Sequence, residues 1–341
     1  MSALVLRLPA ASFRLPKRLI FVNLLLGLVL IALAARALLG GAYPLALSQV
    51  MTALSGEGSA IQQLIVVEYR LPRLLTAIGV GLAFGLAGEM IQTLLRNPLA
   101  SPDIIGFSAG AGAGAIFAVV FLGGTAMILT GALVGGALAA AAVVALAWRR
   151  GIAPGQVVLI GIGVTLTLGV VSDLLMTRLD ATSAAALMKW LVGSLHNRSY
   201  GEVQIIWLGL AVLLPLVLWH QFALGRSAMP EDVSHSLGMA LNRSRMTTLA
   251  LSVALVGLAV AAAGPLPFVA FVSGPIAHGL NRAPRPTVLT AGLIGAIITL
   301  LADAVSQSLP GGLSLPAGVF TALIGAPVLI WVLFLQARKQ R

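Results

Sequence analysis

The chain contains no cysteine and few charged residues. None of its 341 residues is cysteine, and Asp, Glu, Lys and Arg together make up 9% of the chain. The missing cysteines exclude disulfide bonds, thiol catalysis and cysteine-held metal sites. A soluble globular chain carries about 25% charged residues. The low charge content therefore argues against a set of soluble domains.

Apolar residues dominate instead. They form 59% of the chain, and the mean hydropathy is +1.03. Several apolar runs approach the ~20 residues that a helix needs to cross a bilayer. We expect an all-α polytopic membrane protein, with residues 1–341 forming one transmembrane domain. The basic segment 1–17 precedes a long apolar run that ends without a small-residue cleavage pattern, so we expect a retained first helix rather than a signal peptide.

The apolar runs predict about ten transmembrane helices. The third and eighth contain Gly and Pro, so these two are expected to be short, tilted or broken. The expected spans cover residues 18–39, 72–95, 104–122, 126–147, 155–178, 203–222, 246–264, 266–280, 287–306 and 316–336.

The net charge of +11 is interpreted as a topology signal, because the basic residues lie in short loops, and loops rich in Lys and Arg stay in the cytoplasm. Nucleic acid is not an expected partner. With both termini in the cytoplasm, the inner set would be Arg7, Arg14, Lys17, Arg18, Arg96, Arg149, Arg150, Arg226, Arg243, Arg245, Arg282, Arg285, Arg338, Lys339 and Arg341. The smaller outer set would be Arg36, Arg70, Arg73, Arg178, Lys189 and Arg198.

Small residues four apart predict where helices pack closely, since lipid gives no hydrophobic drive for helix association. The run from Gly110 to Ala115 also matches a dinucleotide-binding fingerprint, but a phosphate loop needs a preceding strand. We therefore expect helix packing there. The predicted packing pairs are Gly81 with Gly85, Gly110 with Gly114, and Gly131 with Gly135.

The sequence shows no motif for nucleotide binding, metal binding or covalent catalysis. None of the three lysines follows Gly and precedes Ser or Thr, so a phosphate-binding loop of that type is excluded and any ATP dependence must come from a partner. The four histidines, at 196, 220, 235 and 278, show no metal-ligand spacing. We expect transport rather than covalent catalysis, with no metal site and no cofactor bound by this chain.

Several motifs carry a family resemblance. Arg70-Leu-Pro-Arg73 precedes the second apolar run, and Arg96-Asn-Pro-Leu-Ala-Ser-Pro-Asp103 follows it. Later come Trp190–Leu195, a segment from Gly264 to Val272, and Leu315–Pro327. In this order the motifs resemble the permease subunits of bacterial ABC importers for iron-siderophores and vitamin B12. The resemblance implies the type II ABC importer permease fold and no ATPase site on this chain.

The resemblance also implies partners. These are two copies of an ATP-binding subunit that carry ATP and Mg, a second similar permease chain (a heterodimer or a homodimer), and a periplasmic or lipid-anchored substrate-binding protein. The location would be the bacterial inner membrane. The segments 101–107 and 190–195 look most like permeases for catecholate siderophores of the ferric-enterobactin type. Ferric hydroxamates, haem and cobalamin remain open as cargo.

The segment 223–245 is the expected cytoplasmic coupling region. Pro230 suits a first helical turn, the acids after it favour that end of a helix, and Gly238 suits its stop, so we expect a short surface helix. The alternative is an amphipathic loop resting on lipid headgroups. The resemblance places the ATPase contact on Glu231, Asp232, His235, Leu237 and Gly238.

Arg70 and Arg73 share one helix face three residues apart. The resemblance gives them a role in docking the binding protein, through acidic residues on its lobes; the alternative is a pair of snorkelling anchors. This chain departs from the family pattern at Ser306 and Gln307, where arginine is common, and at His278, also a usual arginine position. An outer and an inner salt bridge are therefore in doubt.

Glu89 lies toward the middle of a span, where a carboxylate costs about 2.5–3.5 kcal/mol. Together with Gln92 and Asn97 it is a candidate gate or proton site; the alternative is a structural carboxylate bonded near the inner interface. Cavity walls are expected from the fifth and tenth spans by resemblance. The rival function is an ion-coupled secondary transporter that uses Glu89, Asp173 and Asp303, although Asp303 fits a helix-end partner better. A non-transporting scaffold is a third possibility.

Overall fold

The computed structural model describes residues 3–8, 11–41, 43–122, 127–148, 151–282, 286–308 and 315–339. A helix occupies each of the ten expected spans. Seven helical stretches in the described ranges are long and apolar enough to cross a membrane by themselves. The ten helices are α1 (Lys17–Leu39), α4 (Leu71–Leu95), α5 (Phe107–Phe121), α6 (Ile128–Ala147), α7 (Pro154–Met176), α9 (Tyr200–Ser227), α11 (Leu241–Ala263), α12 (Val269–Asn281), α13 (Val288–Gln307) and α14 (Ala317–Lys339).

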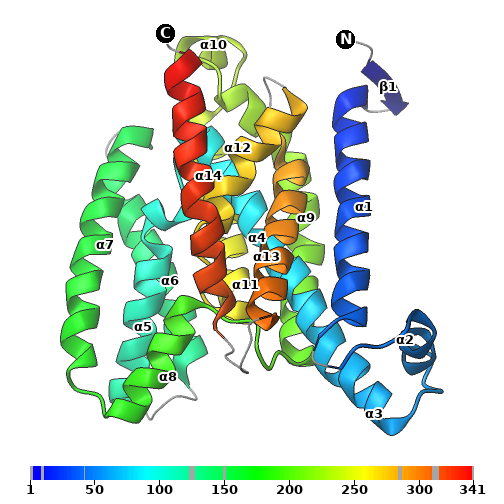
Figure 1. Ribbon diagram of the computed structural model, residues 1–341. Helices are drawn as coiled ribbons and strands as arrows, with labels where there is room; N and C mark the ends of the chain where they lie inside the picture. The colour runs from blue at the N-terminus through cyan, green and yellow to red at the C-terminus, as the bar shows by residue number, and fades with distance from the viewer. Residues whose placement is uncertain are drawn as a thin grey trace.

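Shorter elements connect these helices at the two ends of the bundle. They are β1 (Ala3–Leu8), β2 (Ala11–Pro16), α2 (Leu47–Leu54), α3 (Ala60–Gln63), the π-helix η1 (Leu64–Arg70), the 3-10 helix η2 (Pro102–Ile105), α8 (Ala181–Val192) and α10 (Glu231–Ser236). The hairpin of β1 and β2 and the end of α14 lie at the same end as α10, whereas α2, α3 and α8 lie at the other (Figure 1). These are called the α10 end and the α8 end.

The structure differs from the all-α expectation in one element. Strands β1 and β2 pair as an antiparallel hairpin in which Ala3 is opposite Pro16. The sequence itself indicates only a basic segment before the first helix here. Helix α8 was not expected either, because twelve residues are too few to give a membrane-span signal.

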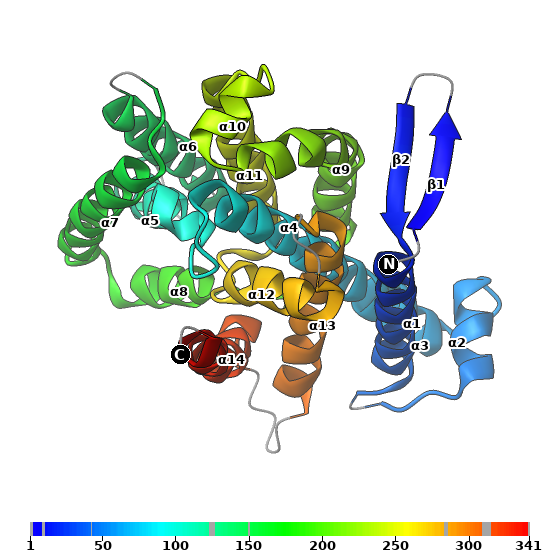
Figure 2. The ribbon, with the colours of Figure 1, turned by 90° about the horizontal axis from the view of Figure 1, so that it is seen from above.

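Helix α4 is the centre of the bundle (Figure 2), and most of its residues are buried. It is apolar around its whole circumference, which is typical of a helix surrounded by other helices. A methyl group added at Gly81 would lie 2.4 Å from the carbonyl oxygen of Gly295, and one at Gly85 would lie 2.2 Å from that of Ala291. The predicted small-residue face thus brings the backbones of α4 and α13 together.

Helices α5 and α6 pack in the same way. A Cβ added at Gly114 would lie 2.1 Å from the carbonyl oxygen of Gly131, and one at Gly135 would lie 2.3 Å from that of Gly110. Both predicted pairs therefore face each other, and the interpretation of Gly110–Ala115 as packing rather than phosphate binding is confirmed for this helix pair. Dispersion contacts between close backbones hold it together.

The expected span 72–95 agrees with α4, but the helical stretch that contains it begins earlier than expected. Residues 60–95 form one continuous helical stretch, in which α3 and η1 lead into α4. Pro72 has no backbone N–H and would leave a carbonyl of the preceding turn without a donor. The helix adopts a π-helical register here, in which the N–H of Leu71 bonds the carbonyl of Val66, five residues earlier. In this register the carbonyl that Pro72 would otherwise bond is that of Val67, and the hydroxyl of Tyr200 donates to it at 2.9 Å.

The two expected interruptions are present. Helix α5 has 15 residues and starts only after η2, and α12 has 13 residues and starts after an irregular segment. Phe268, just before α12, has a left-handed backbone with φ +65°. Ile104 in η2 lies against α7, since a Cβ at Gly161 would be 1.7 Å from its carbonyl oxygen. The segment 97–106 therefore turns back into the bundle beside α7 instead of staying at the α10 end.

Basic side chains are unevenly divided between the ends. Arg149, Arg150, Arg285 and Arg341 of the expected inner set lie outside the described residues. At the α8 end lie Arg36, Arg70, Arg73, Arg178, Lys189 and Arg198, and at the α10 end lie Lys17, Arg18, Arg96, Arg226, Arg243, Arg245 and Arg282 together with the segments that hold Arg7, Arg14, Arg338 and Lys339. The larger set thus shares the end that carries α10.

Candidate functional site

The expected short helix is present at the α10 end. Helix α10 has two acids in its first turn, Glu231 and Asp232, and both are exposed. Leu237 follows it with 56% of its surface exposed. Gly238 has φ +72°, and no atom would lie within 4 Å of an added Cβ. The side chain of His235 lies outside what the structure describes.

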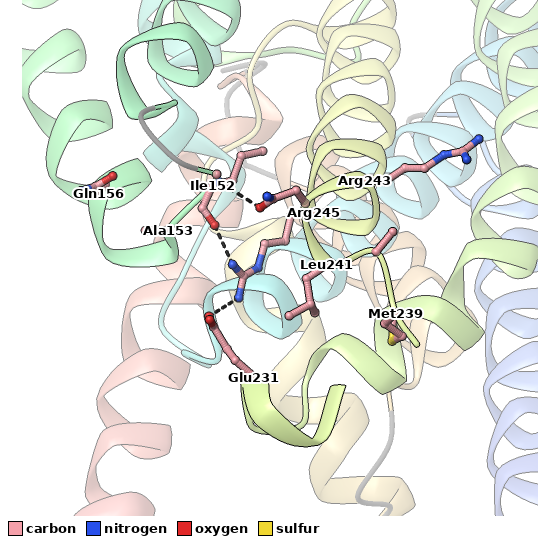
Figure 3. Close-up of a pocket in the computed structure, with 11 residues that line it drawn as sticks. Ile152, Ala153, Gln156, Glu231, Met239, Leu241, Arg243 and Arg245 are labelled. Atoms are coloured by element: carbon pink, nitrogen blue, oxygen red, sulfur yellow. Dashed lines mark hydrogen bonds and ion pairs between the residues drawn. The ribbon is translucent and has the colours of Figure 1, made fainter. Parts of the chain in front are cut away.

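A cavity of about 770 Å³ opens beside α10. Its walls come from three connections at this end: α10 itself, the start of α11, and the segment between α6 and α7. Arg245 of α11 crosses between them, pairing with the carboxylate of Glu231 and donating to the carbonyl of Ile152 at 2.8 Å (Figure 3). Only 8% of the Arg245 side chain is exposed. The cavity is thus built around a buried cation that has two partners.

The anchor of α10 toward the bundle is Ser234, which is fully buried. Its hydroxyl donates to the carbonyl of Arg226 at the end of α9 at 3.0 Å. Sequence reasoning named the exposed residues of this segment but missed Ser234, Arg96 and Arg245, which hold it. Only Arg96 could have been singled out from the sequence, since it begins the Arg-Asn-Pro motif. The three side chains bond mostly to backbone carbonyls, which leave no pattern in the sequence.

The arginines of the Arg-Leu-Pro-Arg motif have partners inside the molecule. Arg73 forms a bidentate ion pair with Asp303 of α13, with Nε and Nη2 at 2.9 and 2.7 Å from its two oxygens. The Asp303 side chain is 3% exposed. Gln307, at a position where the resemblance implied arginine, donates to the same carboxylate at 2.8 Å. Asp303 is therefore a helix-end partner at the α8 end.

Arg70 organises the segment before α4. Its guanidinium donates to the carbonyl of Leu38 at 2.6 Å and to that of Tyr43 at 2.5 Å. These bonds tie η1 to the end of α1 and to the chain that follows it. Arg70 and Arg73 thus both bridge elements of the chain, a role that neither the docking nor the anchor interpretation included.

Glu89 is fully buried, and its partners come from two other elements. The backbone N–H of Thr287 donates to Oε1 at 2.8 Å, and Nε2 of His278 lies 2.9 Å from the same oxygen. The sequence places the inner salt bridge from position 278 in doubt, because histidine stands there instead of arginine. His278 nevertheless contacts a carboxylate, that of Glu89. The second carboxylate oxygen lies against Gly274, where a Cβ would be 2.9 Å away. These bonds match the structural interpretation of Glu89.

Gln92 and Asn97 form local contacts near the same end. The amide of Gln92 donates to the carbonyl of Phe271 at 2.8 Å, which fixes α4 against α12. The Asn97 side chain accepts from the backbone N–H of Leu99 at 2.9 Å and closes the turn after α4. Glu89 and Gln92 therefore meet at α12, whereas Asn97 lies in the turn that leaves α4.

The three acids of the rival mechanism are not brought together. Glu89 and Arg73, the partner of Asp303, lie 16 positions apart on one helix, which corresponds to about 24 Å along its axis. Asp173 is exposed on α7, at the edge of the bundle (Figure 2). In the described part of the chain, no group of three or more His, Asp or Glu side chains is placed to hold a metal ion.

Comparison with known proteins decides the family. Residues 24–335 match the model of the FecCD transport family. The chain belongs to the FecCD transport family. It is 34% identical to the ferric enterobactin transport system permease protein FepG of Escherichia coli over 331 residues, which cover 95% of this chain and 98% of FepG. It is 33% identical to the Fe(3+)-citrate import system permease protein YfmE of Bacillus subtilis, over 96% and 98% of the two chains.

The fold of this FecCD member agrees with that assignment. A solved inward-facing structure of a metal-chelate type ABC transporter superposes with a TM-score of 0.83 at 26% identity, covering 92% of this chain and 99% of the other. The chain is thus an ABC importer permease of the siderophore and iron-citrate family, a multi-pass membrane protein. Such permeases work with ATP-binding and substrate-binding partners and have no ATPase site of their own.

Proposed function

We propose that this chain is a permease subunit of an ATP-driven importer that moves a ferric siderophore, of the catecholate type, across the bacterial inner membrane. The observation that carries the proposal is the match along nearly the whole chain to permeases named for ferric enterobactin and Fe(3+)-citrate transport. The segments 101–107 and 190–195 favour the catecholate class. Transport proceeds by alternating access. The cargo cavity between two permease chains opens to one side of the membrane at a time.

The complex that we propose has two permease chains, this one and a similar second chain, with two ATP-binding subunits on the α10 end and a substrate-binding protein on the α8 end. The two permease chains form a heterodimer in this proposal, with a homodimer as the alternative. This chain binds no cofactor, and ATP and Mg belong to the partner. Both termini lie in the cytoplasm, as the excess of Lys and Arg at the α10 end favours.

Energy enters through α10 in this proposal. The exposed Leu237 and the acids Glu231 and Asp232 offer a contact surface to the ATP-binding subunit. Nucleotide-driven closure of the two ATP-binding subunits displaces this surface, and the helices joined to it change their tilt. Helices α7 and α14 line the path of the chelate. The partly exposed hydrophobic face of α7 suits a bulky, weakly held cargo.

An uptake experiment separates this function from its rival. The chain is reconstituted into proteoliposomes with its neighbouring permease, ATP-binding and binding-protein subunits, and uptake of radiolabelled ferric catecholate is followed. Uptake that vanadate abolishes and that survives an uncoupler supports the ATP-driven importer. Uptake that collapses with the proton gradient, in vesicles holding this chain alone, supports an ion-coupled transporter. The separation of Glu89 from Asp303 favours the first outcome.

The cargo class needs a second measurement. Unlabelled ferric catecholate, ferric hydroxamate and ferric citrate are compared as competitors for uptake of the labelled catecholate. Competition by the catecholate alone supports the proposed class. Equal or stronger competition by ferric citrate or by the hydroxamate contradicts it while leaving the importer function in place.

A further inference from the structure

Residues 228–240, the part of the expected coupling region 223–245 that contains α10, are called the coupling segment. Few side chains join this segment to the bundle. Ser234 holds it to α9, which directly precedes it in the chain, so this bond passes no movement to a distant element. Two arginines reach it from elsewhere in the sequence. Arg96 comes from the end of α4, and Arg245 comes from the first turns of α11.

Arg96 links the coupling segment to the turn after α4. Its guanidinium donates to the carbonyls of Ser227, at 3.2 Å, and Met229. Arg96 is also the residue at which α4 ends, with a left-handed backbone of φ 49° and ψ 34°. The segment that follows it turns back into the bundle through η2 and then begins α5. Met229 is therefore bonded directly to the residue that precedes the segment 97–106.

Arg245 links the coupling segment to the connection between α6 and α7. One arm of its guanidinium pairs with Glu231 of α10, and the other donates to the carbonyl of Ile152. Asn242, one turn earlier on α11, accepts from the N–H of Ile152 at 3.2 Å. The residue Ile152 is thus held at both its N–H and its carbonyl, two positions before α7 begins at Pro154.

The chemistry of these contacts suits transmission of force. A guanidinium is planar and presents its donors in a fixed fork, so two bonds from one arginine fix the distance between their acceptors better than two flexible contacts would. Three of the four acceptors are backbone carbonyls, which cannot move without moving their elements. The low exposure of Arg245 also keeps water from replacing its partners.

We propose that Arg96 and Arg245 are positioning residues that transmit movement of α10 to the segment 97–106 and to α7. This inference rests on the proposed function, in which α10 receives the movement of the ATP-binding subunit. With both arginines in place, a displacement of α10 pulls on the start of the re-entrant segment and on the first turn of α7. Without them, α10 is held to the rest of the bundle mainly through α9 and the flexible Gly238.

The test measures coupling rather than stability. Arg96→Gln and Arg245→Gln are compared with the wild-type chain in the assembled importer, in proteoliposomes loaded with ATP, using radiolabelled ferric catecholate and, as a second probe, ferric citrate. We expect ATP hydrolysis to stay within about twofold, while the amount of chelate imported per ATP falls by about fivefold or more. The concentration of loaded binding protein that gives half-maximal uptake should not change.

Arg243→Gln is the matched control. Arg243 lies two residues from Arg245 on the same helix, is exposed, and points away from Glu231 and Ile152 (Figure 3). The control removes the same charge at the same end but breaks no link, so its import per ATP should equal that of the wild type. An equal loss in the control would overturn the proposal, because it would mean that charge at this surface, not the links, matters.

A variant that preserves the buried arginine covers the case in which Arg245→Gln does not assemble. Glu231→Gln leaves the bond from Arg245 to Ile152 in place and removes the charge that pairs α10 with Arg245. Import per ATP should fall while the melting temperature changes little. Because Glu231 also lies on the proposed docking surface, the affinity for the ATP-binding subunit is measured in the same variant and should change little. Unchanged import per ATP in both Glu231→Gln and Arg96→Gln would overturn the inference. Absence of ATP-driven uptake in the wild-type complex with either probe would instead contradict the proposed function.

Discussion

At the scale of single residues, the backbone contacts of α4 set a strict limit on side-chain size. A Cβ at Gly88 would lie 1.9 Å from the carbonyl oxygen of Ala270. Gly88→Ala should therefore push α12 away from α4 and lower the free energy of unfolding by about 1–3 kcal/mol. Gly163→Ala is the control, because a Cβ there meets nothing within 4 Å. Thermal unfolding in detergent compares the two, and an equal melting temperature for both variants would contradict this packing.

Arg73 could act within the chain, through its ion pair with Asp303, or also dock the binding protein. One pair of variants separates these two roles. Arg73→Gln and Asp303→Asn both break the ion pair between α4 and α13, but only the first removes a positive charge from the α8 end. If Arg73 also docks the binding protein, Arg73→Gln should weaken that association about fivefold at low salt, and less at high salt. Asp303→Asn should leave the affinity nearly unchanged. Equal losses of affinity, measured by titration, would leave Arg73 with a structural role only.

At the scale of elements, α8 depends on a single capping carboxylate. Asp180 accepts from the backbone N–H groups of Thr182 and Ser183, each at 3.0 Å. Hydrogen bonds from Ser183 hold the pKa of Asp180 below its ordinary value of 3.8. Because the pKa is lowered, Asp180 is charged and the cap is complete at neutral pH. The stabilisation that the cap gives is lost only as the pH falls below 3.8.

Asp180→Ala should therefore speed amide hydrogen exchange in the first turn of α8 at pH 7. The difference from the wild type should shrink as the pH drops below 3.8, once intrinsic exchange rates are divided out. Asp180→Asn keeps an acceptor without the charge, so its exchange should lie between the two and depend little on protonation. A wild-type exchange rate equal to that of Asp180→Ala at pH 7 would show that the cap does not hold the turn.

The surface at α10 that is proposed to contact the ATP-binding subunit can be tested by substitution. Because Leu237 is exposed, Leu237→Arg should not affect folding, yet it should lower import per ATP if this surface meets the ATP-binding subunit. Leu280→Arg, which makes the same change on an exposed side chain at the end of α12, is the control. Import and ATP hydrolysis are measured together in proteoliposomes. Normal coupling in Leu237→Arg would count against the docking role of α10.

The elements show which features the sequence could predict. The seven long apolar helices of the described ranges were recognisable because lipid demands about twenty apolar residues for each span. The short helix before Gly238 was recognisable from its proline, its acids and its glycine. The π-helical turn before Pro72 and the capped α8 were missed, since short or irregular helices leave no periodic apolar pattern. The links made by Arg96 and Arg245 were missed because their acceptors are mostly carbonyls, which any residue provides.

At the scale of the whole molecule, α7 exposes an apolar face along its length. Leu159, Leu166 and Val170 are 73%, 67% and 70% exposed along one helix. Lipid can cover such a face, but α7 is also the helix that Ile152 ties to the coupling segment. In the complex proposed above, the second permease chain would lie against this edge, and the walls of the cavity between the two chains would move with α10.

The orientation of the bundle in the membrane can be tested by cysteine labelling. Because the chain has no cysteine of its own, an introduced cysteine is its single thiol. Glu57→Cys places a thiol on the connection between α2 and α3 at the α8 end, and Ser236→Cys places one on α10; both positions are exposed. In right-side-out vesicles, a membrane-impermeant maleimide should label Glu57→Cys at once and Ser236→Cys only after lysis. The reverse pattern would put α10 outside, where no ATP-binding subunit could reach it, and labelling of both before lysis would contradict their placement on opposite sides of the membrane.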